Sequence, residues 1–273
     1  PLELYYCKIC SNSQLGIVVP PEKMFDDYLY LSSTSKQFQD HFVKFAEELV
    51  LNYDLDQDSL LVDIGSNDGI LLKPLIENNI KSIGVEPAKN LSDKANELGY
   101  ETINEYFDEN TVSNIKKVYG EADIITACNV FAHSDGLFEI LDNAFSLLKK
   151  GGTFIVEVQY LVSMLEDLSF DNVYHEHVNY WNVTSMKNFL EINGYVLSNV
   201  EKIDTHGGSI RCYINKNEDS INSNVEEFIT KEKEIGIDKI ETYSLFSEKI
   251  EKQKKNTLKA LKELKKNNGV IAG

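Results

Sequence analysis

Phenol, carboxylate and imidazole side chains gather in one short stretch of the chain, at Tyr174-His175-Glu176-His177. Neutral imidazole is the usual general base near pH 7, so this stretch could remove a proton from a substrate. If the backbone is extended here, Tyr174 and Glu176 lie on one face and both histidines on the other. Two histidines at this spacing could instead begin a metal site, but no matching set of carboxylates accompanies them.

Two further histidines lie in motif-like stretches. His133 ends the run from Asn129, which follows a buried strand-like segment, and doubly wound sheets bind ligands at the carboxyl ends of their strands. His206 opens a run of two glycines, Ser209 and Ile210 that ends at Arg211, the single arginine among the 27 basic residues. The plainer interpretations are a structural histidine at 133 and a hairpin turn at 206.

A glycine-containing turn follows the strand-like residues 60–64. It reads Asp63-Ile64-Gly65-Ser66-Asn67-Asp68-Gly69, and glycine lets the backbone pass close to a ligand. The helix that begins after this turn offers free N–H groups. Glu86 ends the next strand-like run, where its carboxylate can bind both hydroxyls of a ribose.

These features indicate a nucleotide-type cofactor. A dinucleotide oxidoreductase would show G-x-G-x-x-G at this turn, but Asn67 stands where the second glycine is expected. The pattern resembles motif I and the following acidic residue of class I S-adenosylmethionine-dependent methyltransferases. That resemblance predicts S-adenosylmethionine as cofactor, held by Asp63, Gly65, Ser66, Asn67, Gly69, Glu86 and Asn129. An NAD enzyme and a degenerate, non-binding domain are the alternatives.

Alternating strands and helices must position these residues. The apolar patterns predict strands at 60–64, 82–86, 122–127 and 153–158, and helices at 36–51, 69–77, 91–98 and 137–148. This order is typical of an α/β fold, in which a doubly wound parallel sheet carries helices on both faces. Residues 1–22 suggest a short β-ribbon, and 222–268 suggest mostly helix with one buried apolar stripe.

The composition excludes several classes of protein. A hydrophobic content of 42% suffices for a packed core, which excludes a wholly disordered chain. A net charge of −17 argues against nucleic-acid and anionic-membrane binding, because phosphate contacts need clustered basic residues. The sequence shows neither an 18-residue apolar run nor a leader-like start, so we expect no membrane span and a cytoplasmic location.

Cys7 and Cys10 form a C-x-x-C pattern, which supplies half of a four-ligand zinc site. No second pair follows at a useful spacing, and Cys128 and Cys212 fall singly inside strand-like runs. The sequence therefore predicts a half site only, with a pair of turn thiols as the alternative.

The motifs together resemble the sugar 3-C-methyltransferases that act on nucleotide-linked 4-keto-deoxyhexoses. The resemblance covers nearly the whole chain and rests on Tyr5 to Cys10, Phe25 to Ser33, Asp63 to Gly69, Asn129 to His133, Tyr174 to His177 and His206 to Arg211. It implies a class I methyltransferase Rossmann-like sheet between a zinc-ribbon-like segment and a helical extension. We expect a partial zinc-knuckle module at 1–22, a helical linker and substrate loop at 23–56, the methyltransferase domain at 57–215, a helical extension at 216–268 and the start of a truncated Rossmann-like domain at 269–273. A structural zinc belongs to the full-length form of such proteins.

The resemblance also implies roles for the residues. A base removes the C3 proton, which the C4 ketone acidifies, and the resulting enolate takes the methyl group. His177 is the implied base, and Tyr174 is the implied hydrogen-bond donor at the enolate oxygen. Glu176 is the group that holds these side chains in place or relays the proton. The sequence leaves open which of the three takes the proton. His133 lines the same pocket, and the implied substrate residues are Tyr28, Ser33, His206 and Arg211. The competing hypotheses are a methyltransferase with another small-molecule acceptor and a non-catalytic module of a larger assembly.

Overall fold

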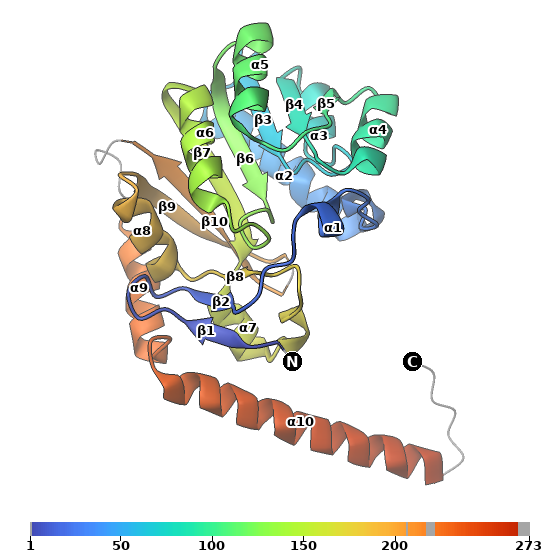
Figure 1. Cartoon of the computed structure of the whole chain (residues 1–273), viewed down its shortest axis with the longest axis vertical. Coiled ribbons are helices and arrows are strands. Elements are labelled where there is room, and N and C mark those ends of the chain that lie inside the picture. Colours follow the sequence, from blue (N-terminus) through green and yellow to red (C-terminus); the bar gives the residue numbers. More distant parts are fainter. Residues whose placement is uncertain (1, 206, 217–221, 267–273) are drawn as a thin grey trace.

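A central mixed sheet organises the protein. The computed structural model describes residues 2–205, 207–216 and 222–266 (Figure 1). Within these residues, seven strands pair in the order β5-β4-β3-β6-β7-β10-β9. Their bounds are β3 (Leu60–Ile64), β4 (Lys81–Val85), β5 (Thr102–Ile103), β6 (Ala122–Cys128), β7 (Leu148–Gln159), β9 (Val196–Ile203) and β10 (Ser209–Asn215). The parallel pairing predicted from the sequence is present from β5 to β7, whereas β10 is antiparallel to both of its neighbours.

Helices cover both faces of this sheet (Figure 1). One face packs against α5 (Glu109–Tyr119), α6 (Leu137–Leu147), α8 (Val183–Ile192) and α9 (Asn224–Ile235). The other packs against α2 (Lys36–Asn52) and α3 (Leu72–Glu77), and α4 (Lys89–Glu97) follows β4. Apolar side chains of the sheet are thereby removed from water on both sides, which is why the strands read as nearly continuous apolar runs.

The sequence analysis missed several elements, among them α5, β5, α8 and β9, and misplaced the start of another. The mostly polar α5 buries only Thr111, Val112 and Ile115 and begins where the Asp108 side chain accepts the Thr111 N–H, and β5 has two residues. The helix expected from residue 69 begins at Leu72, because Gly69 is left-handed (φ 80°) and still belongs to the turn that follows β3.

A smaller sheet lies beside the main one. The expected N-terminal ribbon is present as β1 (Leu4–Tyr6) and β2 (Ser13–Leu15), and β8 (Asn179–Tyr180) adds a third strand in the described part of the chain. The short helices α1 (Glu22–Phe25) and α7 (Leu161–Asp167) complete the fold, with 3-10 turns at Ser32–Thr34 and Phe170–Asn172.

The C-terminal extension is two helices rather than one. Gly236 adopts a left-handed conformation (φ 75°) that ends α9, and α10 (Ile240–Lys266) follows. α9 is anchored by Glu232, whose carboxylate accepts the backbone N–H groups of Val183 and Thr184 at the start of α8. The buried stripe expected along this region is wrong for α10, since none of its 27 described residues is buried and the helix extends away from the body (Figure 1). The strand expected at 269–273 lies outside the described residues.

The described helices include none that is both long and apolar enough to cross a bilayer.

Candidate active site

One cavity of about 880 Å³ gathers most of the residues that the sequence singles out. It opens at the carboxyl ends of β3, β4 and β6, where a doubly wound sheet places its ligands. One group of lining residues belongs to the glycine turn and its surroundings: Asp63, Gly65, Ser66, Asn67, Glu86 and Asn129. A second group comes from the motif-like stretches around the histidines: Tyr28, His133, Tyr174, Glu176 and His177.

The glycine turn brings backbone close to the cavity. Gly65 is in the left-handed region (φ 65°), and a Cβ there would lie 2.6 Å from Cγ2 of Val130. Any other residue would be strained and would displace Val130, so this position requires glycine. Asn67 is also left-handed (φ 51°), and its backbone N–H donates to Oε2 of Glu86 at 2.9 Å.

The Glu86 carboxylate is fixed at the cavity wall. Its Oε2 accepts from Asn67 and its Oε1 accepts from the Ala88 N–H at 2.9 Å, so two hydrogen bonds fix the carboxylate at the cavity wall. Burial raises the pKa of Glu86, and those two N–H groups oppose the rise. A carboxylate has about four acceptor positions, so lone pairs remain for hydrogen-bond donors of a ligand in the cavity.

Asp63 and Asn129 complete this side of the cavity. Burial raises the pKa of Asp63 to about 7, although its Oδ1 accepts a hydrogen bond from Thr126 Oγ1 at 2.6 Å. Asn129 is left-handed (φ 61°) directly after β6, and its N–H donates to the Glu157 carbonyl at 2.7 Å. A strained non-glycine residue at a strand end is typical of a ligand site.

Tyr174 to His177 form a turn instead of an extended strand. The His177 N–H donates to the Tyr174 carbonyl at 3.2 Å, which brings the phenol within 3.1 Å of the Nε2 atom of His177. The two-faced arrangement expected for an extended backbone is therefore absent from this turn. His175 is exposed and does not line the cavity.

The orientation of the His177 ring follows from its second nitrogen. Nδ1 lies 2.9 Å from the Asn172 carbonyl oxygen, which can only accept, so in the neutral ring Nδ1 carries the hydrogen. The lone pair of the neutral imidazole is then on Nε2, facing the Tyr174 phenol. Burial, and to a smaller extent the charge of Glu176, raises the pKa of Tyr174 to about 12. The phenol therefore stays a hydrogen-bond donor at neutral pH.

Tyr28 and His133 join the same cluster through Glu176. The Tyr28 phenol donates to Oε2 of Glu176 at 3.0 Å, and burial followed by this carboxylate raises the pKa of Tyr28 well above its usual range. Nδ1 of His133 lies 3.1 Å from the Glu176 carbonyl oxygen, and the His133 and His177 ring centroids are 5.0 Å apart. The cluster can therefore take up a proton at a ring nitrogen and donate hydrogen bonds from a phenol.

Comparison with known proteins identifies the family. The family model described as "Methyltransferase domain" matches residues 35–200, which is more than half of the chain. The chain belongs to this methyltransferase family. A second model, described as "C-methyltransferase C-terminal domain", matches residues 204–273.

A curated relative is also a methyltransferase. The chain is 33% identical over 210 residues to the C-methyltransferase NovU of Streptomyces niveus. That match covers 77% of this chain and 50% of NovU, so the chain spans about half the length of this relative.

Solved structures confirm the predicted fold. A complex between the Haloferax volcanii Trm112 methyltransferase activator and a methyltransferase matches with a TM-score of 0.52 at 14% identity, over 66% of this chain and 92% of that one. The plantazolicin methyltransferase BamL, solved with a triazolic analog and SAH, matches with a TM-score of 0.51 at 12% identity, over 67% and 87%. The sheet is thus that of a class I, Rossmann-like methyltransferase.

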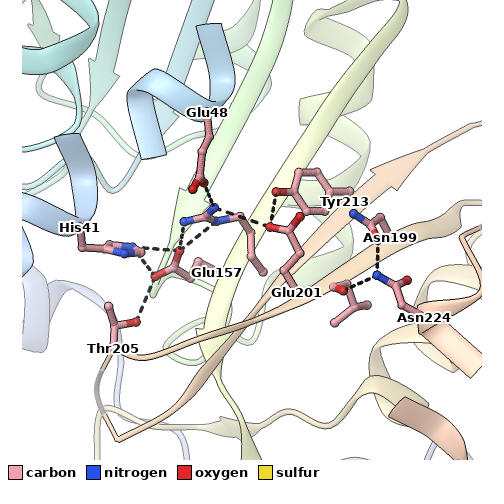
Figure 2. A network of polar contacts seen from close by, with 10 residues as sticks. His41, Glu48, Glu157, Asn199, Glu201, Thr205, Tyr213 and Asn224 are labelled. Atoms are coloured by element: carbon pink, nitrogen blue, oxygen red, sulfur yellow. Dashed lines mark hydrogen bonds and ion pairs between the residues drawn. The ribbon is translucent and has the colours of Figure 1, made fainter. Parts of the chain in front are cut away.

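Arg211 of this methyltransferase does not reach the cavity, contrary to the substrate role expected for it. Its side chain is 2% exposed and lies 3.7 Å above the Phe45 ring, with ion pairs to Glu48 at 2.8 Å and Glu157 at 3.2 Å. Figure 2 shows His41, Glu48 and Glu157 pointing toward this buried network. The guanidinium is therefore already paired with carboxylates of the chain itself and is used to join β7 and β10 to α2.

Three other expected residues, Ser33, Gly69 and Ser66, also differ in place. Ser33 donates a hydrogen bond to Asp68 instead of lining the cavity, and Gly69 (φ 80°) shapes the turn behind it. Ser66 lines the cavity, but a Cβ on Gly84 would collide with its hydroxyl, so the side chain points toward β4. His206 lies outside the described residues.

The sequence missed a second set of lining residues. They come from the segment before α5, the start of α6 and the end of β7: Tyr106, Phe107, Asp108, Glu139, Ile140 and Gln159. The aromatic pair just before the helix cap Asp108 was the available signal, because a flat apolar side chain beside an acceptor suits a purine ring.

The described residues contain no cluster of three or more side chains suited to a metal ion. Cys7 and Cys10 are both free thiols, and their half site acquires no further ligand within the described ranges.

Proposed function

We propose that the chain is an S-adenosylmethionine-dependent C-methyltransferase that removes the C3 proton of a nucleotide-linked 4-keto-deoxy sugar and methylates the resulting enolate. The observation that carries this proposal is the Tyr174–His177 pair, with its 3.1 Å contact, in the same cavity as Glu86. The C-methyltransferase family match and the relative NovU support carbon as the methylated atom.

The cofactor would bind on the glycine-turn side. Glu86 would accept hydrogen bonds from the ribose, and Gly65 would let the backbone pass under the methionine part. Asp108 and the aromatic side chains of Tyr106 and Phe107 suit the adenine. When bound, S-adenosylmethionine supplies an electrophilic methyl group on a positively charged sulfur. The Glu86 carboxylate, which two backbone N–H groups hold at the cavity wall, favours a positively charged ligand there.

His177 would take the proton. Because Nδ1 is held by the Asn172 carbonyl, the Nε2 lone pair is the basic site of the ring. When Nε2 gains a proton it can no longer accept from Tyr174, so the phenol hydrogen becomes available to the developing enolate oxygen. Removal of the proton and stabilisation of the oxygen are thus linked in one pair of side chains.

The bonds balance without a further reactant. The C3–H electron pair becomes part of the enolate while the proton moves to His177. The enolate carbon would then use that pair for the new carbon–carbon bond to the methyl group, while the methyl–sulfur bond breaks, its electrons stay on the sulfur and S-adenosylhomocysteine leaves. Glu176 would orient Tyr28, whose phenol lies 3.0 Å from the carboxylate, against the sugar.

The charge of the cavity lining limits how the acceptor can bind. Among the described residues, the cavity lining has no lysine or arginine and seven carboxylates: Asp27, Asp63, Glu86, Asp108, Asp135, Glu139 and Glu176. A diphosphate would be repelled by this lining, so the sugar would enter the cavity while the nucleotide stays outside it.

The same observation favours a second candidate, methylation of a carbon acid that carries no phosphate. Radiolabelled methyl transfer to nucleoside-diphosphate 4-keto-deoxy sugars and to the matching free keto sugars would separate the two candidates. The first predicts product only from the nucleotide-linked set, whereas comparable rates with both sets favour the second. Calorimetric titration with S-adenosylhomocysteine, with NADH as the control, tests the cofactor independently, and binding of NADH alone would contradict both candidates.

A further inference from the structure

A strap of residues 26–34 joins the two sides of the cavity. It leads from α1 to α2 and contributes Tyr28, Tyr30 and Ser32 to the cavity lining. The Tyr28 phenol reaches Glu176 on the acceptor side, and Ser32 contacts the glycine turn on the cofactor side.

Two asparagine side chains hold the strap by its backbone. Asn67 donates to the Tyr30 carbonyl and accepts from the Ser32 N–H, each at 3.0 Å. Asn90, on α4, donates to the Tyr28 carbonyl at 2.8 Å and accepts from the Tyr28 N–H at 3.2 Å. An asparagine amide that pairs with both backbone groups of one residue fixes the direction of that residue's side chain as a neighbouring strand would.

Asn90 is not among the residues that line the cavity, and its side chain contacts the backbone of Tyr28. It lies four residues after Glu86 and holds Tyr28 62 positions away in the sequence. The two hydrogen bonds of Asn90 therefore connect α4, which follows Glu86, to the backbone of Tyr28. The phenol of Tyr28 lies on the acceptor side of the cavity.

We propose that Asn90 is a positioning residue, which holds the Tyr28 backbone so that the phenol points at Glu176 and the acceptor. The proposal rests on the proposed function, since it assigns Tyr28 to the acceptor side of the same site. Loss of the Asn90 clamp lets the strap shift, and a misplacement of a contacting group by a fraction of an ångström reduces turnover.

α4 offers a matched control. Asn96 also pairs with both backbone groups of one residue, donating to the Thr102 carbonyl at 2.8 Å and accepting from its N–H at 3.0 Å. It makes the same kind of contact from the same helix but does not touch the strap. Asn90→Asp and Asn96→Asp each remove one amide donor, so they separate positioning of Tyr28 from damage to α4.

The test is a double-mutant cycle on the kcat of methyl transfer. The acceptor is the keto sugar that reacts fastest among those compared under the proposed function. Asn90→Asp should lower kcat roughly 3- to 10-fold and leave the Kd for S-adenosylhomocysteine within twofold. In a Tyr28→Phe background it should have no further effect, whereas Asn96→Asp should lower kcat equally in both backgrounds or not at all. Hydrogen exchange of the strap amides should rise in Asn90→Asp and stay unchanged in Asn96→Asp.

Two results would overturn the inference. If Tyr28→Phe lowers kcat but Asn90→Asp does not, or the two effects multiply, Asn90 does not act through Tyr28 and the proposed function stands. If Tyr28→Phe keeps the wild-type kcat, the placement of Tyr28 in the proposed function is wrong and the inference fails with it.

Discussion

The Nδ1 atom of His177 lies 2.9 Å from the carbonyl oxygen of Asn172, and this contact decides which nitrogen of the ring can act as a base. A carbonyl oxygen only accepts, so the hydrogen of the neutral imidazole is on Nδ1 and the lone pair is on Nε2. Nε2 in turn lies 3.1 Å from the Tyr174 phenol. One backbone carbonyl thereby turns the basic nitrogen of the ring toward the Tyr174 phenol at the cavity.

Removal of the Tyr174 phenol should slow the reaction without weakening cofactor binding. Tyr174→Phe leaves His177 in place but deletes the donor to the enolate oxygen, and loss of such a donor typically costs about 100- to 1,000-fold in kcat. Because burial raises the pKa of Tyr174 to about 12, the wild-type rate should show no alkaline loss from this group below about pH 11. Steady-state kinetics between pH 6 and pH 10 test both points, and an unchanged kcat in Tyr174→Phe would exclude the donor role.

Glu86 should control cofactor affinity. Glu86→Gln places an amide where the two backbone N–H groups of Asn67 and Ala88 now donate, so one of them loses its acceptor. We expect the Kd for S-adenosylhomocysteine to rise at least tenfold, because a bond to a charged acceptor contributes about 1.5–3 kcal/mol. The exposed Glu97 of α4 provides the control variant Glu97→Gln. Equal affinities for the two variants in calorimetry would show that Glu86 does not hold the ribose.

Asp63 should make the stability of the ligand-free protein fall as the pH rises. Burial raises its pKa to about 7, while the unfolded chain titrates near 3.9. Between about pH 4 and pH 7 the folded protein keeps a proton that the unfolded chain has released. The free energy of unfolding therefore decreases across this range, by up to about 1.4 kcal/mol per pH unit from this group.

Asp63→Asn cannot titrate, so its unfolding free energy should fall less steeply over that range. Urea unfolding of both proteins at pH 4.5, 6.0 and 7.5 measures the difference. Parallel curves would mean that Asp63 is ionised in the folded protein throughout.

Arg211 should contribute to stability and not to ligand binding. Burial pushes the pKa of Glu157 upward, but the hydrogen bond from His41 and the charge of Arg211 hold it below its usual value. Arg211→Lys loses the paired guanidinium contacts and should lower the free energy of unfolding by roughly 3 kcal/mol, with an unchanged Kd for S-adenosylhomocysteine. Lys202→Arg, at an exposed position of the neighbouring strand, serves as the control. A normal stability with a lost affinity would restore the ligand-binding role.

Local sequence patterns predicted those parts of the site that depend on neighbouring residues in the chain. Gly65 and Glu86 follow from strand ends and a turn, and the structure places both at the cavity. Arg211 was misinterpreted because its partners Glu157 and Glu48 lie 54 and 163 positions away, so no local pattern reveals that its charge is already paired. The turn at Tyr174 was equally hidden, because the strap and the small sheet that hold it are formed by distant segments.

The central claim is that His177 removes a proton from the carbon that is later methylated. Incubation of a nucleoside-diphosphate 4-keto-deoxy sugar in heavy water, with the protein and without a methyl donor, measures that step alone. We expect deuterium at C3 with the wild-type protein and with His175→Asn, whose exposed histidine lies two residues away, and an exchange rate at least 100-fold lower with His177→Asn. Exchange at the wild-type rate in His177→Asn would contradict it.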